Sequence, residues 1–173
     1  AGLTNFYRNY GAKCAPMVIA FDMLKAVGAV LLGNYFLGYL LGWGAAGKYF
    51  GALFCVIGHM FPVFYGFKGG KGVLVAGGAI LAIQPILLPV LAAIFLLCLV
   101  PTGMVSLGSI TMAASYPVLT LIYGLLKGFA MGDLIVCVVG AAIMGGMVIW
   151  MHRANIQRIR EGKEYRFGSK HKQ

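Results

Sequence analysis

The sequence predicts an all-α integral membrane protein, a polytopic bundle of about six transmembrane helices. Of its 173 residues, 61% are hydrophobic and only 10% are charged, whereas an ordinary soluble domain has roughly 25% charged residues. The apolar residues fall in long runs between short polar connections. Glycine, with 26 residues, is enriched, as it is where helices pack closely in lipid. We therefore expect one membrane-embedded domain over residues 1–173, with the lipid bilayer as its solvent.

Six apolar segments are expected to form the helices. In chain order they cover residues 14–32, 45–61, 73–83, 85–100, 107–126 and 131–151. A straight helix needs ~20 residues to cross a bilayer. The third segment is too short for this, so it must include its "KGGKG" lead-in, stop short of one face or end within the membrane. The stretch 34–44 is apolar, uncharged and broken by glycines. It is expected either to extend the first helix or to lie in the membrane interface.

The distribution of positive charge predicts the orientation. Four alternate connections are the amino end, residues 62–72, the stretch "PTGMVS" and the carboxy-terminal tail, and together they hold eleven of the 14 Lys and Arg. Seven of these lie in the tail. Because cytoplasmic connections carry an excess of Lys and Arg, all four are expected in the cytoplasm. This distribution suits anionic lipid or an anionic substrate, and we expect no nucleic acid as a partner.

The first of four polar clusters on this side lies in "GLTNFYR". Thr4, Asn5 and Arg8 offer a hydroxyl, an amide and a guanidinium, and arginine binds phosphate in a bidentate manner. Polar groups are expensive at membrane depth and so mark candidate functional residues. An ordinary polar cap before a helix explains the same residues equally well.

The second cluster lies in "GHMFPVFYGFKGGKGV" at residues 58–73. Its glycine–lysine loop consists of Lys68, Gly69, Gly70, Lys71 and Gly72. Glycines let backbone amides approach an anion, and the lysines add charge. The loop is not a Walker A motif, because Gly72 stands where a hydroxyl is required. An anion-binding loop is favoured over a flexible turn with a positive flank, and His59 is expected to be structural.

The third cluster, "MVSLGS", places Ser106 and Ser109 at a helix start, where simple capping is a strong alternative to a site.

One charged pair lies inside an apolar segment. Asp22 and Lys25 are three residues apart and can pair on one helix face. A structural pair is favoured there over a proton or ion relay.

The fourth cluster, "HRANIQRIREGKE", follows the last apolar segment. His152 and Asn155 share a face if the helix continues, since they are three residues apart. Arg153, Arg158 and Arg160 surround them with positive charge. A juxtamembrane segment that holds anionic lipid is the alternative. A titratable group beside an amide and several cations favours a site. Together the clusters predict an oxyanion site at the cytoplasmic surface, open to water and lipid.

"GHMFPVFYGFKGGKGV" and "HRANIQRIREGKE" closely resemble two signatures of the bacterial acyl-phosphate:glycerol-3-phosphate acyltransferases, the PlsY family. "AGLTNFYR" resembles the second half of a third signature, and "MVSLGSI" resembles a further family segment. The resemblance covers essentially the whole chain in the same order. It implies a seven-helix enzyme of the bacterial plasma (inner) membrane with a cytoplasm-facing site. The enzyme transfers a fatty acyl group from acyl-phosphate to glycerol 3-phosphate, giving lysophosphatidic acid.

The resemblance also implies roles for individual residues. The catalytic set is Lys71, His152 and Asn155. The substrate-binding set is Thr4, Asn5, Arg8, Lys68, Gly69, Gly70, Gly72, Ser106 and Arg153. Glu164 falls on an acidic position of the third signature and is expected to be structural. No visible feature requires a coenzyme or metal, and neither is expected. The soluble-type acyltransferase signature H-x-x-x-x-D is absent. It requires Asp five residues after a histidine, but Phe64 follows His59 at that distance and Gln157 follows His152.

The sequence departs from the family pattern at two places. The family's first helix and its glycine-serine-glycine-asparagine stretch do not precede Ala1, so the chain is expected to be amino-terminally truncated. Leu74 and Val75 stand where the family usually has alanine and threonine. Two other functions stay open on the residues alone: a transporter of a phosphate-bearing anion, and a non-catalytic membrane protein that binds anionic lipid.

Overall fold

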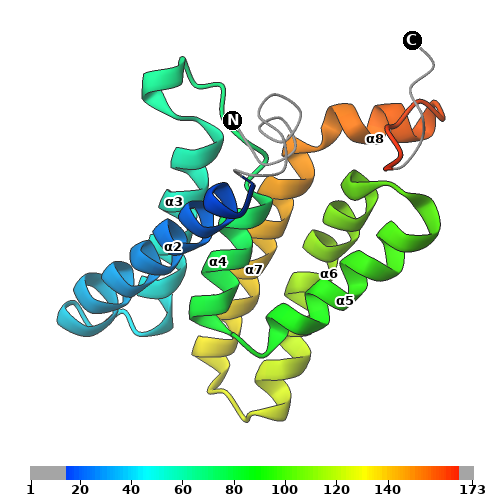
Figure 1. Cartoon of the computed structure of the whole chain (residues 1–173). Helices are drawn as coiled ribbons and strands as arrows, with labels where there is room; N and C mark the ends of the chain where they lie inside the picture. The colour runs from blue at the N-terminus through cyan, green and yellow to red at the C-terminus, as the bar shows by residue number, and fades with distance from the viewer. Residues whose placement is uncertain (1–14, 168–173) are drawn as a thin grey trace.

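The computed structural model describes residues 15–167, which form helices and turns without a strand. Figure 1 shows a bundle with one short helix across its end. In chain order the elements are α2 (Ala15–Gly33), η2 (Asn34–Leu40), α3 (Ala45–Met60), η3 (Val63–Tyr65), α4 (Val73–Ile83), α5 (Leu87–Thr102), α6 (Val105–Leu126), α7 (Met131–Met151) and α8 (Arg153–Arg160).

The six expected segments all form helices, with bounds that agree within two residues. Among the described residues, four helical stretches are long and apolar enough to cross a membrane: Ala15–Leu40, Ala45–Tyr65, Val105–Leu126 and Met131–Met151. α4 and α5 are shorter apolar helices. The stretch that follows α2 extends that helix as the π-helix η2, which decides between the two expectations for it.

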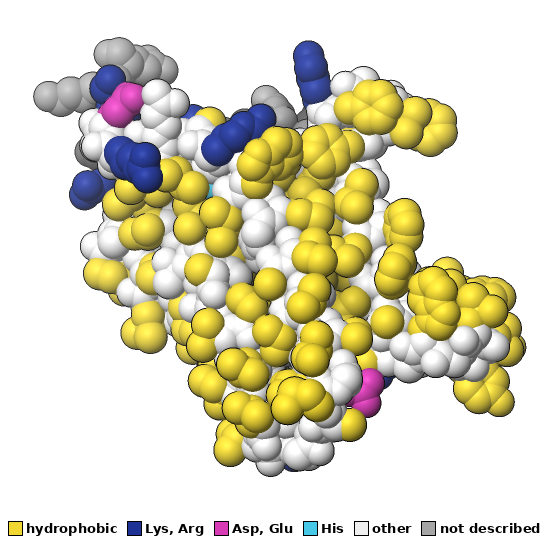
Figure 2. Space-filling view, turned by 180° about the vertical axis from the view of Figure 1, so that it is seen from behind, with side chains coloured by type: hydrophobic (Ala, Val, Ile, Leu, Met, Phe, Trp, Pro, Cys, Tyr) yellow, Lys and Arg dark blue, Asp and Glu magenta, His cyan; other side chains and the backbone are white. Residues whose placement is uncertain are grey.

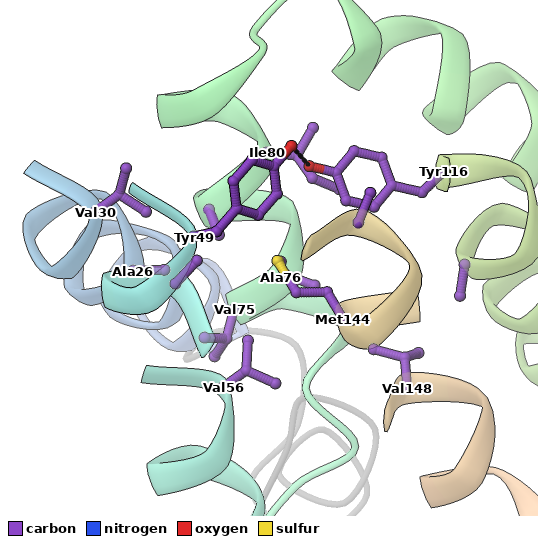
Figure 3. Close-up of a cluster of buried hydrophobic side chains, with 14 of the residues drawn as sticks. Ala26, Val30, Tyr49, Val56, Val75, Ala76, Ile80, Tyr116, Met144 and Val148 are labelled. Atoms are coloured by element: carbon purple, nitrogen blue, oxygen red, sulfur yellow. Dashed lines mark hydrogen bonds between the residues drawn. The ribbon is translucent and has the colours of Figure 1, made fainter. Parts of the chain in front are cut away.

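The core is formed mainly by α2, α3, α4, α6 and α7, and Figure 3 shows a central part of it. Small and branched side chains such as Ala26, Val56 and Ala79 are completely buried. The hydroxyls of Tyr49 and Tyr116 lie 3.4 Å apart and form a hydrogen bond across the core. This bond lets two tyrosines be buried between apolar helices without an unpaired hydroxyl.

The outer faces of the bundle are apolar, as a lipid-exposed surface requires. Figure 2 shows hydrophobic side chains over the sides of the molecule, whereas Lys and Arg gather mainly at the end that carries α8. Large side chains such as Phe21, Phe54 and Leu126 are more than half exposed. In water such a surface would cause aggregation, so the described residues have the character of an integral membrane protein.

Glycines bring α2 and α3 into backbone contact. A Cβ atom at Gly51 would overlap the carbonyl oxygen of Ala29, and one at Gly47 would overlap the backbone of Gly38. Small residues four positions apart let membrane helices approach closely, and Gly47 and Gly51 act in this way. Ala142 and Gly146 in α7 have the same spacing, but a Cβ at Gly146 would meet nothing within 4 Å, so this pair makes no such contact.

The polar connections predicted to share one side do lie at one end of the bundle. The chain enters α2, joins α3 to α4, joins α5 to α6 and leaves α7 for α8 at the same end (Figure 1). The glycine–lysine loop, Ser106 and the tail therefore meet. Thr4, Asn5 and Arg8 lie outside the described residues.

Replacing Gly51 by alanine should destabilise the fold by about 1–3 kcal/mol, because the added methyl group would force α2 and α3 apart. Gly58→Ala, in the same helix, is the matched control. Its Cβ would meet nothing within 4 Å, and alanine is the better helix former. Thermal unfolding of both variants in detergent measures the difference. Equal unfolding temperatures would contradict the backbone contact.

Candidate active site

The glycine–lysine loop is tied to the carboxy-terminal end of α3. After η3 the chain turns back, and the amides of Gly69 and Gly70 donate to the carbonyls of Met60 and His59, both at 3.1 Å. These bonds satisfy carbonyls that the end of a helix leaves unpaired. The two amides therefore serve α3, rather than pointing at an outside anion as the sequence suggested. The charge of the loop, not these amides, is its feature suited to an anion.

Glycine is required where the loop enters α4. Gly72 precedes the first residue of α4 with φ of 78°, a left-handed conformation that other residues adopt at a cost. A Cβ there would also press on the side chain of Met60. This tight turn sets the backbone position of Lys71 at the amino end of α4.

A break between α7 and α8 places the fourth cluster. α7 ends at Met151, and the carbonyl of His152 accepts the amide of Ile156 at 2.9 Å to begin α8. α8 turns away from the axis of α7 and crosses the end of the bundle (Figure 1). The helix therefore does not continue through His152, which was the condition for a shared helix face. Both site candidates nevertheless turn inward: His152 is 2% and Asn155 5% exposed.

Asn155 joins the loop to the tail. Lys71 Nζ donates to Asn155 Oδ1 at 2.7 Å, and Asn155 Nδ2 donates to Glu164 Oε1 at 2.7 Å. Only this orientation of the amide presents oxygen to the ammonium and nitrogen to the carboxylate. A buried amide thus holds a cation and an anion on opposite sides and fixes both.

The chain reverses after α8 to bring Glu164 to this position. Gly162 has φ of 69°, and the amides of Gly162 and Lys163 donate to the carbonyls of Ile159 and Arg158. This is the pattern of a helix that ends at a left-handed glycine. Further along, the amide of Phe167 donates to the Gly103 carbonyl at 2.6 Å, so the tail lies over the α5–α6 turn.

Glu164 is the centre of the polar network. Its carboxylate accepts Ser106 Oγ at 2.7 Å and Arg158 Nε at 2.8 Å, besides Asn155. The side chain is only 6% exposed. Burial would raise the pKa of Glu164, but the hydrogen bonds from Ser106, Asn155 and Arg158 and the charge of Arg158 outweigh it, so the pKa lies below its ordinary value. Glu164 is therefore ionised at neutral pH.

His152 is held in one tautomer beside this network. Its Nδ1 lies 2.7 Å from the Val148 carbonyl oxygen, so Nδ1 carries the hydrogen and donates it. Nε2 then has a lone pair in the neutral ring. Burial lowers the pKa of His152 and so does the charge of Lys71, against opposing effects of the Val148 bond and Glu164. At neutral pH the ring is an acceptor or base at Nε2.

Other predicted site residues are placed differently. The Arg153 guanidinium stacks over the Trp150 ring at 4.4 Å from its centroid, and the side chain of Lys68 is exposed at the surface of the loop. Within residues 15–167, neither side chain is hydrogen-bonded to Asn155 or Glu164. Ser109 Oγ donates to the Val105 carbonyl within α6. The capping alternative for Ser106 is wrong, because its hydroxyl donates to Glu164 and not to the backbone at the start of α6.

The convergence on Glu164 was missed from the residues alone. Ser106 and Glu164 are 58 positions apart, and no periodicity connects them. The available signal was compositional, because Glu164 is one of only four acidic residues in the chain and an isolated carboxylate among cations is expected to be paired.

An apolar hollow adjoins the polar network. Its wall comes from α4, α6 and α7 and runs from beside the site into the core; the lining residues are Val73, Ala76, Ile80, Met112, Ala113, Tyr116, Met144, Gly145 and Val148. Val73 follows the glycine–lysine loop directly, and Val148 is bonded to His152. The hollow has room for little more than a water molecule. An apolar chain would therefore lie against the exposed apolar faces of the helices, with an anionic head beside Lys71. These features define a helical membrane protein with a polar site at one end of the bundle.

Comparisons with known proteins give the family. The sequence model described as "Glycerol-3-phosphate acyltransferase" matches residues 1–162. A glycerol-3-phosphate acyltransferase of Finegoldia magna is 36% identical over 97% of this chain and 78% of its own length. One from Rhizobium etli is 38% identical over 98% of this chain and 75% of its own. The chain belongs to the glycerol-3-phosphate acyltransferase family.

Solved structures agree with this assignment. The crystal structure of PlsY, an integral membrane glycerol 3-phosphate acyltransferase, in its lysophosphatidic acid form superposes with a TM-score of 0.78 at 32% identity. The match covers 96% of this chain and 79% of that one. The glycerol 3-phosphate form gives a TM-score of 0.76. The PlsY resemblance seen in the sequence is thereby confirmed.

Replacing Glu164 by glutamine should reduce stability in a pH-dependent way. Because the folded pKa is lowered, the carboxylate stabilises the protein fully above its ordinary pKa of 4.5, and this contribution is lost as the pH falls through the folded value. The gap in unfolding temperature between wild type and Glu164→Gln should therefore be constant near neutrality and narrow below about pH 4. Glu161→Gln is the control, since its side chain is 42% exposed. A gap that widens in acid would contradict the network.

Proposed function

We propose that the chain transfers a fatty acyl group from acyl-phosphate to glycerol 3-phosphate, forming lysophosphatidic acid. The observation that carries the proposal is the placement of the Lys71–Asn155–Glu164 network at the end of a bundle whose outer faces are apolar. Family membership supports it, and so do the related PlsY structures that contain glycerol 3-phosphate and lysophosphatidic acid.

The charge of the site suits phosphate. The network contains Lys71, Arg158 and one ionised carboxylate, while His152 is neutral, so it carries one excess positive charge. Asn155 holds the Lys71 ammonium in place on one side. A fixed cation costs less to reorganise around a bound phosphate than a flexible surface lysine does.

The donor is assigned to acyl-phosphate on chemical grounds. An acyl-phosphate is a mixed anhydride with a good leaving group, so its reaction depends on positioning and charge neutralisation more than on a strong base. The hydroxyl oxygen of glycerol 3-phosphate attacks the acyl carbon, an ester bond forms, and the bond from carbon to the phosphate oxygen breaks. The hydroxyl proton leaves with a phosphate oxygen or through His152 Nε2, and inorganic phosphate is released.

The rival functions explain fewer of the contacts. An anion transporter is favoured by charges at the midplane of several helices. Within residues 15–167 the charged side chains inside the apolar helices are Asp22, Lys25, Lys48 and Asp133. Lys48 and Asp133 lie in the first turns of α3 and α7, and Lys25 contacts His59 at the end of α3. A protein that only holds anionic lipid through its basic tail does not need Lys71 bonded to a buried amide. We assign Lys71 to the acceptor phosphate, and His152 and Asn155 to the reacting centre.

The end that carries α8 is assigned to the cytoplasm of a bacterial plasma membrane. In a variant without native cysteines, Lys68→Cys should resist an impermeant maleimide in intact cells and react after permeabilisation, because cytoplasmic connections carry the positive charge. A cysteine at Met131, on the opposite end, is the control and should react in intact cells. The reverse labelling pattern would overturn the orientation.

The purified protein should acylate glycerol 3-phosphate from acyl-phosphate, and not from acyl-coenzyme A or acyl carrier protein. The reason is that the site offers charge neutralisation without the H-x-x-x-x-D pair. The test is product formation with each donor at equal concentration in detergent or liposomes. Equal use of acyl-coenzyme A would overturn the donor assignment.

Lys71→Ala and His152→Ala should separate binding from turnover. Loss of a charge-assisted hydrogen bond costs about 1.5–3 kcal/mol, or roughly ten- to a hundred-and-fifty-fold. Lys71→Ala should mainly raise KM for glycerol 3-phosphate, since it removes a binding contact. His152→Ala should mainly lower kcat, since it removes a contact at the reacting centre.

Steady-state kinetics with each substrate varied make this measurement, and gel filtration in detergent verifies folding. Lys163→Ala is the matched control, because its side chain is 74% exposed and pairs with Glu161 outside the network, and it should change neither constant more than about twofold. Full activity of His152→Ala would remove it from the reacting centre. A Lys71→Ala effect limited to acyl-phosphate would assign Lys71 to the other substrate.

A further inference from the structure

A second polar cluster lies under the glycine–lysine loop. Lys25 Nζ is 2.5 Å from Asp22 Oδ1 and 3.0 Å from His59 Nδ1. The pairing of Asp22 and Lys25 expected from their spacing is thus confirmed, and His59 from α3 extends it. Asp22 and His59 side chains are 12% and 9% exposed. α2 and α3 are therefore joined by three polar side chains that the proposed reaction does not use.

The geometry fixes the state of the His59 ring. An ammonium has only hydrogens to donate, so Lys25 donates both to the Asp22 carboxylate and to Nδ1 of His59. Nδ1 must then carry the lone pair, and the hydrogen of the neutral ring is on Nε2. The 3.6 Å between His59 Nδ1 and Asp22 Oδ1 is too long for a hydrogen bond. Lys25 therefore links Asp22 to His59, and it holds the His59 ring at Nδ1.

The opposite edge of this ring rests on the glycine–lysine loop. A Cβ atom at Gly70 would overlap Nε2 of His59, and the Gly70 residue is buried. The amide of Gly70 also donates to the carbonyl of the same histidine at 3.1 Å. His59 thus contacts Gly70 through both its ring and its backbone, one residue before Lys71.

We infer that Asp22, Lys25 and His59 form a positioning cluster that sets the glycine–lysine loop, and through it Lys71, for the acceptor phosphate. Asp22 holds Lys25, Lys25 holds the His59 ring, and the ring fixes how closely Gly70 approaches α3. Lys71 Nζ must reach Asn155, 84 positions away on α8, so a small shift of the loop breaks that bond. The inference rests on the proposed function for its kinetic readout only.

A substitution in the loop tests the contact between Gly70 and the His59 ring directly. Gly70 has no left-handed φ, so Gly70→Ala adds a methyl group whose obstacle is the His59 ring. Gly70→Ala should raise KM for glycerol 3-phosphate roughly tenfold, with kcat changed less, because Lys71 is displaced from a binding contact. In a His59→Ala background the obstacle is gone, and the added effect should fall below about twofold.

Gly69→Ala is the matched control. Its Cβ would overlap the carbonyl oxygens of His59 and Met60, which are backbone atoms that His59→Ala leaves in place. Its effect should therefore be the same in both backgrounds. If His59→Ala does not fold, His59→Asn replaces it as the background. The asparagine oxygen can still accept a hydrogen bond from Lys25, and the shorter side chain leaves room for the methyl group at position 70. A Gly70→Ala effect of equal size in both backgrounds would overturn the inference.

Hydrogen exchange followed by mass spectrometry tests the same contact without activity. Lys25→Ala and His59→Ala should each speed exchange severalfold in peptides that cover residues 61–72, where the Gly69 and Gly70 amides are bonded, and leave peptides from α6 unchanged. Unchanged exchange together with a raised KM in Lys25→Ala would make Lys25 a direct phosphate ligand and overturn the positioning role. A wild-type protein that fails to acylate glycerol 3-phosphate would defeat the proposed function, while the exchange data would still decide this inference.

Discussion

The burial of one carboxylate organises the site end of the molecule. Glu164 is removed from water and must be compensated there, and hydrogen bonds from Ser106, Asn155 and Arg158 provide this. These partners come from α6 and α8, so satisfying the carboxylate requires α8 to lie across the bundle and the tail to fold back over the α5–α6 turn. Lys71 then completes the set through Asn155. The break after α7 and the left-handed Gly162 both serve this one requirement.

The membrane and the site place opposite demands on the same helices. Close packing in lipid depends on backbone contact, as at Gly47 and Gly51, and leaves few polar atoms in the core. The polar groups are therefore concentrated at one end, in two clusters that meet at the glycine–lysine loop. One cluster, around Asp22 and His59, supports the loop from α2 and α3. The other, around Glu164, receives the Lys71 side chain. A phosphate group held there would lie between water and the apolar faces of the helices.

Much of the fold could be predicted from the sequence, because apolar runs report directly on helices in lipid. α4 and α7 have the predicted bounds, and the predicted connections that lie within residues 15–167 do share one end of the bundle. The sequence predicted which residues belong to the site better than it predicted which of them are in contact. Lys71, His152 and Asn155 were identified by type and resemblance, but their geometry depends on a helix break and a chain reversal that have no periodic signal. The Gly69 and Gly70 amides were misassigned for the same reason, since only the fold shows that they bond to α3.

The central claim is that Lys71 and Asn155 act as one unit, tied to Glu164, rather than as two independent groups. A double-mutant cycle with Lys71→Met and Asn155→Leu tests it most directly, with kcat/KM for glycerol 3-phosphate as the measured quantity and gel filtration in detergent as the test of folding. Contacting residues of one network couple by about 0.5–3 kcal/mol. The account predicts that the double variant is scarcely worse than the poorer single variant. Losses that multiply, as for two residues without a shared function, would contradict it.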